Sequence, residues 1–282
     1  MYQEQGVRQK GSANYLIIER TNPFRWIVQL IKKVLVIAEL EVRKLKHDPT
    51  ELFTRAAQPA LWMLVFGEVF TRVRAIPTGS LSYLDFMAPG ILAQSVLFVA
   101  IFYGIAIIWE RDLGIVHKFL VSPTPRSALV LGKALSAGVR AISQAIIIYI
   151  LSLLLNVNLS WQPLNLIGIL FVIIISASLF STFSLIIACI VKTRERFMGI
   201  GQVLTMPLFF ASNAIYPIAI MPDWLKLFAH INPLTYEVDA LRALMINGGQ
   251  SVYGVGVDLG TLFLSLIILT AIASKIYPNV VR

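Results

Sequence analysis

The chain has 282 residues, of which 57% are hydrophobic and 14% are charged. Soluble domains carry about 25% charged residues, so this deficit, together with several long apolar runs, indicates a membrane protein. The single cysteine excludes an internal disulfide and a cysteine-based metal cluster, and the three scattered histidines have no metal-ligand spacing. A net charge of +9 would suit nucleic acid, but the basic residues gather on one side of the apolar runs.

The N-terminal region divides into two parts. Residues 1–23 are polar and lack periodicity, which predicts a flexible cytoplasmic N-terminus. Residues 24–47 alternate apolar and basic faces with helical spacing, and Trp26 stands near one end. This pattern predicts an amphipathic helix in the membrane interface, with packing on a soluble partner as the alternative. Because Lys32 and Lys33 interrupt the apolar residues, we do not expect a signal peptide.

Six apolar runs are long enough to cross about 30 Å of hydrocarbon. They lie at about 51–71, 87–109, 127–155, 163–191, 197–220 and 255–274. We therefore expect an all-α integral membrane protein whose transmembrane domain covers residues 48–282. Lys and Arg are concentrated before the first run, after the second, after the fourth and in the tail, which predicts that both termini are cytoplasmic.

The connection between the fifth and sixth runs contains two half-apolar pieces, 222–230 and 235–245, which are too short to cross. Asn232-Pro233 separates them, and Gly248-Gly249 follows the second. We predict interfacial or re-entrant helices on the outer side. Re-entrant backbone is tolerated only beside protein or water, so these helices should cap a cavity.

Residues 109–133 form the cytoplasmic connection between the second and third runs. Helical spacing places three residues of this connection on one apolar stripe, namely Leu113, Val116 and Leu120. We predict a short helix with Glu110 and Asp112 in its first turn and with His117 and Lys118 near its end, as the helix dipole favours. Such a helix would dock a soluble partner; the alternative is a solvated connector that only sets the topology.

Several polar residues fall inside or beside the apolar runs. Arg140 lies well inside the third run, where a charge is costly unless it faces the bundle or a wet cavity. It would contact an anionic headgroup or the transport path, or else form a structural pair with Glu68 or Gln144. Asn213 and Tyr216, near the outer end of the fifth run, are placed to line an exit.

Two stretches resemble a known family. Residues 110–133 read ERDLGIVHKFLVSPTPRSALVLGK, which resembles the signature of the ABC-2 permeases, the membrane subunits of ABC exporters. Asp112, Ile115 and His117 depart mildly from the commonest choices in that signature. Residues 232–242 read NPLTYEVDALR and resemble a second motif of the same family. The two motifs stand in the right order, and the resemblance covers about residues 43–275.

The resemblance implies a dimer of six-span subunits, formed by two copies or by close paralogues. Each subunit would dock a cytoplasmic ATP-binding subunit that carries ATP and Mg²⁺, while this chain binds no cofactor or metal. Its coupling helix would include Glu110, Arg111, Asp112, Gly114, His117, Lys118 and Leu120. Its outer cap would include Asn232, Pro233, Tyr236, Asp239 and Arg242.

The implied activity is export of an amphipathic drug, lipid or lipid-linked glycan, as in the daunorubicin-resistance permeases. The location would be the cell inner membrane, or a plastid membrane if the chain is organelle-encoded. The sequence has no phosphate-binding loop, because Gly132-Lys133 lacks the upstream glycine, so we do not expect ATP hydrolysis by this chain. A stand-alone secondary transporter or channel is the alternative, and it would need ionisable residues in several spans. A membrane-embedded enzyme is disfavoured by the missing motifs.

Overall fold

The structure, a computed structural model, describes residues 57–73, 76–79, 81–114, 116, 126–191 and 193–277. This part of the chain is helical, and its one β pairing is an isolated bridge between Leu159 and Ile246. The predicted all-α class is therefore confirmed. The predicted N-terminus, 1–23, and interface helix, 24–47, lie outside the described residues.

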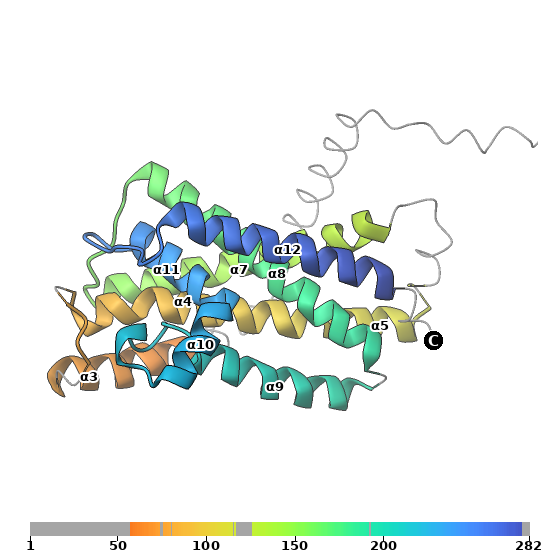
Figure 1. The fold of residues 1–282 in the computed structure, drawn as a ribbon, viewed down its shortest axis with the longest axis horizontal. Helices are drawn as coiled ribbons and strands as arrows, with labels where there is room; N and C mark the ends of the chain where they lie inside the picture. Colours follow the sequence, from red (N-terminus) through yellow and green to blue (C-terminus); the bar gives the residue numbers. More distant parts are fainter. Residues whose placement is uncertain are drawn as a thin grey trace, which may run out of the picture.

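The named helices run mostly along the longest axis of the molecule (Figure 1). In chain order they are η1 (Trp62–Gly67), α3 (Glu68–Val73), α4 (Tyr83–Tyr103), α5 (Ile105–Asp112), α7 (Arg126–Leu154), α8 (Pro163–Ile190), α9 (Arg194–Phe210), η2 (Ile218–Ile220), α10 (Asp223–Ile231), α11 (Pro233–Met245) and α12 (Val255–Ile276). The first, η1, is a π-helix and η2 is a 3-10 helix.

Four stretches in the described part are long and apolar enough to cross a membrane. They are Tyr83–Asp112, Leu129–Leu154, Pro163–Ile190 and Val255–Ile276. They coincide with the second, third, fourth and sixth predicted runs, although the second begins four residues earlier than expected. An α-helix satisfies its own backbone hydrogen bonds, which is the condition for crossing hydrocarbon.

The fifth predicted run, 197–220, is wrong at its end, because α9 has 17 residues and stops at Phe210. Its last carbonyl groups are satisfied by side chains instead of by further helix. The Asn232 amide donates to the carbonyl oxygens of Leu208 at 2.7 Å and Ala211 at 2.9 Å, and the Tyr216 hydroxyl donates to that of Phe210. In the first predicted run, the described part is helical from residue 57 to residue 73.

Helix α8 lies at the centre of the bundle and packs against α4, α7, α11 and α12. Its small buried residues allow these close approaches, and they include Ser176, Ala177, Ser181, Ser184 and Ala188. Between α4 and α5, the missing side chain of Gly104 leaves room for Ser184, whose hydroxyl donates to the carbonyl of Ile101. A Cβ at Gly104 would lie 2.0 Å from the Ser184 oxygen, so a larger residue would force α8 away.

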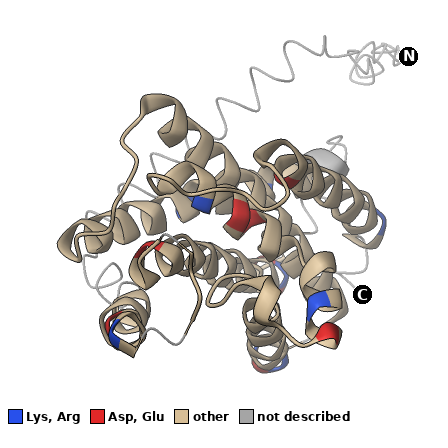
Figure 2. Cartoon of the chain, turned by 60° about the vertical axis from the view of Figure 1, so that its left-hand side comes forward, with Lys and Arg blue, Asp and Glu red and all other residues tan. Residues whose placement is uncertain are grey.

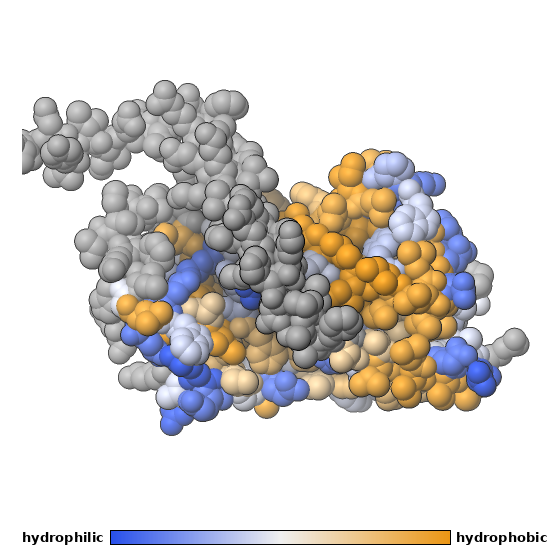
Figure 3. All heavy atoms as spheres, turned by 180° about the vertical axis from the view of Figure 1, so that it is seen from behind, coloured by the Kyte–Doolittle hydropathy of each residue, from blue (hydrophilic) through white to orange (hydrophobic). Residues whose placement is uncertain are grey.

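The outer surface suits a hydrocarbon environment. Charged residues are sparse along the described helices (Figure 2). Seen from behind, the uncovered surface is largely hydrophobic in its middle part, and hydrophilic residues collect towards the lower left and along the right-hand edge (Figure 3). Large apolar side chains point outward on several helices, for example Leu164 at 79% exposure and Val203 at 70%. The protein is thus an integral membrane protein with apolar residues both inside and outside.

The two short predicted helices between the fifth and sixth runs are present as α10 and α11. They differ sharply in burial. Helix α10 exposes Trp224, Leu227, Phe228 and Ile231, whereas α11 buries nearly its whole surface against α4, α8 and α12. Their position relative to the membrane remains a prediction.

Candidate functional site

Helix α5 ends and α9 begins at one end of the bundle (Figure 1). Charged side chains join α5 there to α7 and α9. We call this group the α5–α9 junction; it consists of Trp109, Glu110, Arg111, Asp112, Lys133 and Arg194. The Asp112 carboxylate accepts hydrogen bonds from Nη2 of Arg194 at 2.8 Å and from Nη2 of Arg111 at 3.1 Å. The Arg194 guanidinium carbon lies 3.5 Å from the centre of the Trp109 ring, a cation–π geometry. The junction therefore links helices that are 82 residues apart in the chain.

Two further contacts extend the junction. Lys133 of α7 forms an ion pair with Glu110 of α5. Nη1 of Arg111 donates to the carbonyl oxygen of Val191, just after α8, at 3.4 Å. All of these charged side chains keep part of their surface exposed, between 16% and 39%. These contacts would therefore transmit a movement of the end of α5 to α7, α8 and α9 together.

The predicted starting point of the helix over residues 110–120 is wrong. Glu110 and Asp112 lie in the last turn of α5, which continues the direction of the second span, and not in the first turn of a separate helix. Gly114 then adopts a φ of +69°, the left-handed conformation that glycine favours, and this ends the helix. Other predicted members of the coupling segment lie outside the described residues, namely His117, Lys118 and Leu120.

The first half of the second motif builds the corner between α10 and α11. The Asn232 side chain accepts a hydrogen bond from the backbone N–H of Leu234 at 3.0 Å and so caps α11, with Pro233 in its first turn. The same side chain closes α9, as described above. The Tyr236 hydroxyl donates to the carbonyl of His230 at 2.7 Å. One asparagine thus terminates one helix and begins another.

The second half of the motif forms a buried polar group. We call it the α11 cluster; it consists of Phe86, Asn213, Asp239, Arg242 and Ser251. Arg242 donates to the carbonyl oxygens of Asn213 at 2.7 Å and Phe86 at 3.3 Å, and its guanidinium carbon lies 3.9 Å from the centre of the Phe86 ring. Nη1 of Arg242 lies 3.8 Å from the Asp239 carboxylate. A buried arginine is tolerated because its donors find acceptors.

Asp239 is even more completely satisfied. It accepts hydrogen bonds from the Asn213 amide at 3.3 Å, the Ser251 hydroxyl at 3.0 Å, and the backbone N–H groups of Val252 at 2.6 Å and Tyr253 at 3.2 Å. The α11 cluster therefore joins α4, the turn after α9, α11 and the loop before α12. In the same region, a Cβ at Gly90 would lie 2.3 Å from the carbonyl oxygen of Ala214, so the turn lies directly on α4.

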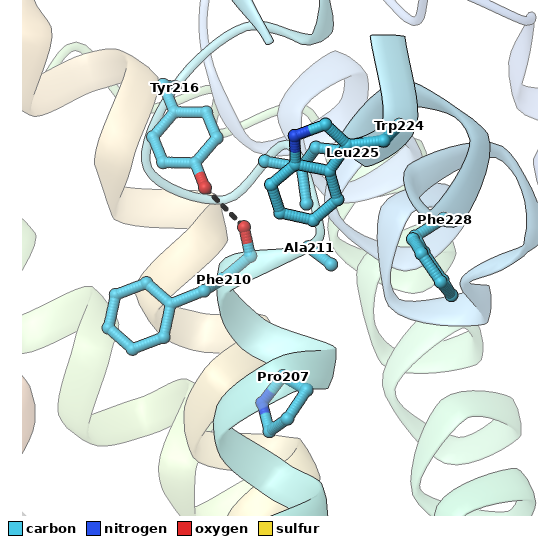
Figure 4. Close-up of a pocket in the computed structure, with 7 residues that line it drawn as sticks. All are labelled: Pro207, Phe210, Ala211, Tyr216, Trp224, Leu225 and Phe228. Carbon is cyan, nitrogen blue, oxygen red and sulfur yellow. Dashed lines mark hydrogen bonds between the residues drawn. The ribbon is translucent and has the colours of Figure 1, made fainter. Parts of the chain in front are cut away.

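An aromatic pocket opens between α9 and α10, with a cavity volume of about 390 Å³ (Figure 4). We call it the aromatic pocket; it is lined by Pro207, Phe210, Ala211, Tyr216, Trp224, Leu225 and Phe228. The Tyr216 hydroxyl points to the backbone carbonyl of Phe210 and donates a hydrogen bond to it (Figure 4). Burial raises the pKa of Tyr216, so this group is neutral. The pocket therefore offers rings and methylene groups rather than charges.

Comparisons with known proteins bear on this arrangement. The family profile described as the ABC-2 type transporter matches residues 32–246, which is most of the chain. The chain belongs to the ABC-2 type transporter family. That range contains both motifs, the α5–α9 junction and most of the α11 cluster. The resemblance drawn from the two motifs is confirmed.

Relatives of this ABC-2 family member are similar along most of their length. The transport permease ycf38 of Cyanophora paradoxa is 27% identical over 216 residues, which are 76% of this chain and 74% of the relative. The ycf38 permease of Porphyra purpurea is 24% identical over 275 residues, 94% of each chain. The daunorubicin resistance ABC transporter permease DrrB1 of Streptomyces coeruleorubidus is 24% identical over 234 residues, 83% of this chain and 82% of the relative.

The predicted polar residues of the transport path lie in separate places. In this ABC-2 transporter chain, the Arg140 guanidinium carbon lies 5.2 Å from the centre of the Tyr103 ring. Glu68 forms its ion pair with Arg72 on α3, at 3.1 Å, so the pairing with Arg140 considered above is replaced by a local one. Asn213 belongs to the α11 cluster and Tyr216 to the aromatic pocket. The structure therefore does not gather these four residues into one site.

Four residues that the motifs did not single out contribute to these groups. Arg194 and Trp109 complete the α5–α9 junction, and Phe86 and Ser251 complete the α11 cluster. All four depend on contacts between distant segments, which no local pattern encodes. A further residue, Glu237, is buried on α11 outside both groups. It had a usable signal, since it is a charged residue in a half-apolar piece.

Proposed function

We propose that this chain is the permease subunit of an ATP-driven exporter. A separate cytoplasmic ATP-binding subunit, holding ATP and Mg²⁺, would supply the energy, and this chain would contribute no ATPase site. Membership of the ABC-2 family supports the transport role. The α5–α9 junction is the observation that supports coupling between the ATP-binding subunit and the spans. At this junction, one connection between spans is linked to three helices.

The proposed orientation places the α5–α9 junction in the cytoplasm. Arg111, Lys133, Arg194 and Lys275 all belong to helix ends at that side of the bundle, in agreement with the positive-inside rule. Both termini would then be cytoplasmic, with the first run and α9 completing six spans. Helices α10 and α11 would lie on the outer side, and α11 would be re-entrant because protein covers nearly its whole surface.

The proposed substrate is an amphipathic molecule such as a drug, a lipid or a lipid-linked glycan. The aromatic pocket supports this class, since its lining is almost entirely apolar and it lies at the outer end of α9. A second permease copy, or a close paralogue, would supply the other wall of the path. The exposed apolar side chains of α9, such as Met198 and Val203, would face that copy or lipid.

The first experiment is affinity purification in a mild detergent, followed by identification of bound proteins and an ATPase assay. We expect a stoichiometric ATP-binding subunit. A Glu110→Ala, Gly114→Val variant should insert normally but lose transport and ATPase stimulation. Arg196→Ala is the matched control, because Arg196 lies beside the junction with an exposed side chain. It should behave as the wild type.

Two results would contradict the proposal. Unaltered export by the Glu110, Gly114 variant would rule out coupling through this segment. Purification of a homo-oligomer that transports without any ATPase would rule out ATP as the energy source. That second result would favour a stand-alone secondary transporter.

A further inference from the structure

Glu237 presents an unusual environment for a carboxyl group. Its side chain is fully buried in α11, at 0% exposure. Neither carboxyl oxygen has a hydrogen-bond partner of normal geometry within the described residues. The hydroxyl of Ser176 on α8 is close enough to interact with it, and this hydroxyl is itself buried and has no other partner there.

Asp239, two residues further along the same helix, shows how many donors a buried carboxyl group can gather. It is buried to the same extent as Glu237. It accepts four hydrogen bonds and lies beside the Arg242 guanidinium. Glu237 has no such set of donors within the described residues. A negative charge on Glu237 would therefore cost more free energy than a negative charge on Asp239.

Within the described part of the chain, the helices packed against α11 place no cation beside Glu237. Helix α8 has no charged residue between its ends. Helix α4 contributes Asp85, which accepts a hydrogen bond from the backbone N–H of residue 158. Helix α12 contributes Asp258, which accepts a hydrogen bond from the Ser251 hydroxyl. Lys275 lies in the last turn of α12, at the opposite end of the bundle from α11. On α11 itself, the Arg242 guanidinium is occupied by the carbonyl groups described above.

We propose that Glu237 is a proton-binding site, and that in the closed protein its carboxylic acid O–H donates a hydrogen bond to the Ser176 hydroxyl. The proton comes from water and returns to water when the site opens. Burial raises the pKa of Glu237, which agrees with this state; α11 is not one of the four candidate spans. The inference does not depend on ATP coupling, because it rests on contacts within one chain.

Proton binding at Glu237 has a mechanical consequence. The neutral acid can stay between α11 and α8, whereas the ionised form would require water. Separation of α11 from α8 would therefore release the proton, and closure would take one up. An outward movement of α11 during a transport cycle would then be accompanied by proton release, even if protons do not drive it.

Infrared spectroscopy of the purified full-length chain tests the assignment directly. A protonated carboxylic acid has a C=O stretching band that is distinct from the carboxylate bands. We expect such a band in the wild type at neutral pH and its loss in Glu237→Gln. Glu68→Gln is the matched control, since Glu68 is exposed and paired with Arg72. It should leave the band in place.

Further outcomes decide the remaining parts of the proposal. Identical band intensity in the wild type and Glu237→Gln would mean that Glu237 is ionised and would overturn the proposal. Failure of Glu237→Gln to fold would also count against it, because glutamine has the shape and charge of the neutral acid. In Ser176→Ala the band should shift in frequency, since its acceptor is gone. An unshifted band would exclude Ser176 as the partner.

The pH dependence of stability gives a second readout with a defined sign. A carboxyl group whose pKa is raised in the folded state stabilises the protein below its unfolded pKa, and this contribution is lost as the pH rises through the folded value. The melting temperature of the wild type should therefore fall relative to that of Glu237→Gln as the pH is raised. A constant difference across the pH range would contradict a bound proton.

Discussion

The α5–α9 junction and the α11 cluster both pair an arginine with an aspartate, but in opposite surroundings. In the junction, the Arg194 and Asp112 side chains are 35% and 39% exposed, whereas Arg242 and Asp239 in the cluster are 6% and 0% exposed. Solvent screens an exposed pair and makes its rearrangement cheap, while a buried pair cannot lose one member without leaving an uncompensated charge. The difference indicates that the α5–α9 junction can rearrange at a low cost in free energy, whereas the α11 cluster is a fixed support.

Removal of Arg242 should have the largest effect. In Arg242→Leu, Asp239 would keep its hydrogen bonds but lose its buried cation, and two carbonyl groups would lose their donor. We expect a loss of about 3–5 kcal/mol of stability, as for other broken buried pairs. Thermal unfolding in detergent would measure it as a large fall in melting temperature or as failure to accumulate.

A matched control sharpens this test. Arg72→Leu removes an arginine from an exposed pair with Glu68 on a single helix. Such pairs contribute about 0.5 kcal/mol or less. Equal effects of the Arg242 and Arg72 substitutions would show that the α11 cluster is not a fixed support.

Asn232→Ala should have the second largest effect on stability. The substitution removes the cap of α11 and the two hydrogen bonds that close α9. Loss of a cap costs about 1 kcal/mol, and unsatisfied buried carbonyl groups add to this, so we expect about 2 kcal/mol in total. Melting temperature measures the loss. Asn232→Asp keeps the cap but places a carboxylate oxygen against the two carbonyl oxygens, and it should be at least as destabilising as Asn232→Ala.

The Asp112–Arg194 pair should have little influence on stability and a large one on function. Arg194→Asp would place two acidic groups together and should leave the melting temperature nearly unchanged while lowering ATPase stimulation and export. The double variant Asp112→Arg, Arg194→Asp restores opposite charges and should recover part of both activities. Absence of any recovery would mean that the two side chains act separately.

Arg140→Leu should change stability least, because it replaces a polar group of an apolar helix with an apolar one. If Arg140 serves the transport path, export should fall while the ATP-binding subunit still co-purifies. Disappearance of the protein from the membrane would instead assign Arg140 a structural role. Quantitative blotting of membranes alongside the transport assay separates these outcomes.

The long helices could be predicted from the sequence because length and hydropathy decide them locally. Helix α8 begins and ends within one residue of its predicted run, since Pro163 opens it and the apolar residues are continuous. The end of α9 could not be predicted in this way. It depends on the side chain of Asn232, which lies more than twenty residues further along the chain.

The candidate sites show the same limit. The motifs singled out Asp112, Asp239 and Arg242, but they gave no indication of which groups these side chains contact. The partner of Asp112 is Arg194, and that of Asp239 includes backbone N–H groups of a loop. The prediction that a helix starts at Glu110 was wrong. Acidic residues favour the first turn of a helix, but here the apolar residues 105–108 form the first turn of α5 and Glu110 follows them.

The shortness of α9 has a consequence for the surrounding bilayer. Its 17 residues span about 25 Å, and the first three of them are Arg, Glu and Arg. A hydrophobic segment shorter than the local membrane draws the lipid inward around it. In the proposed orientation, the outer leaflet beside α9 and α10 should therefore be locally thinned, with the exposed rings of Trp224 and Phe228 at the level of the depressed headgroups. A molecule that left the protein there would have less hydrocarbon to cross than beside the four longer spans.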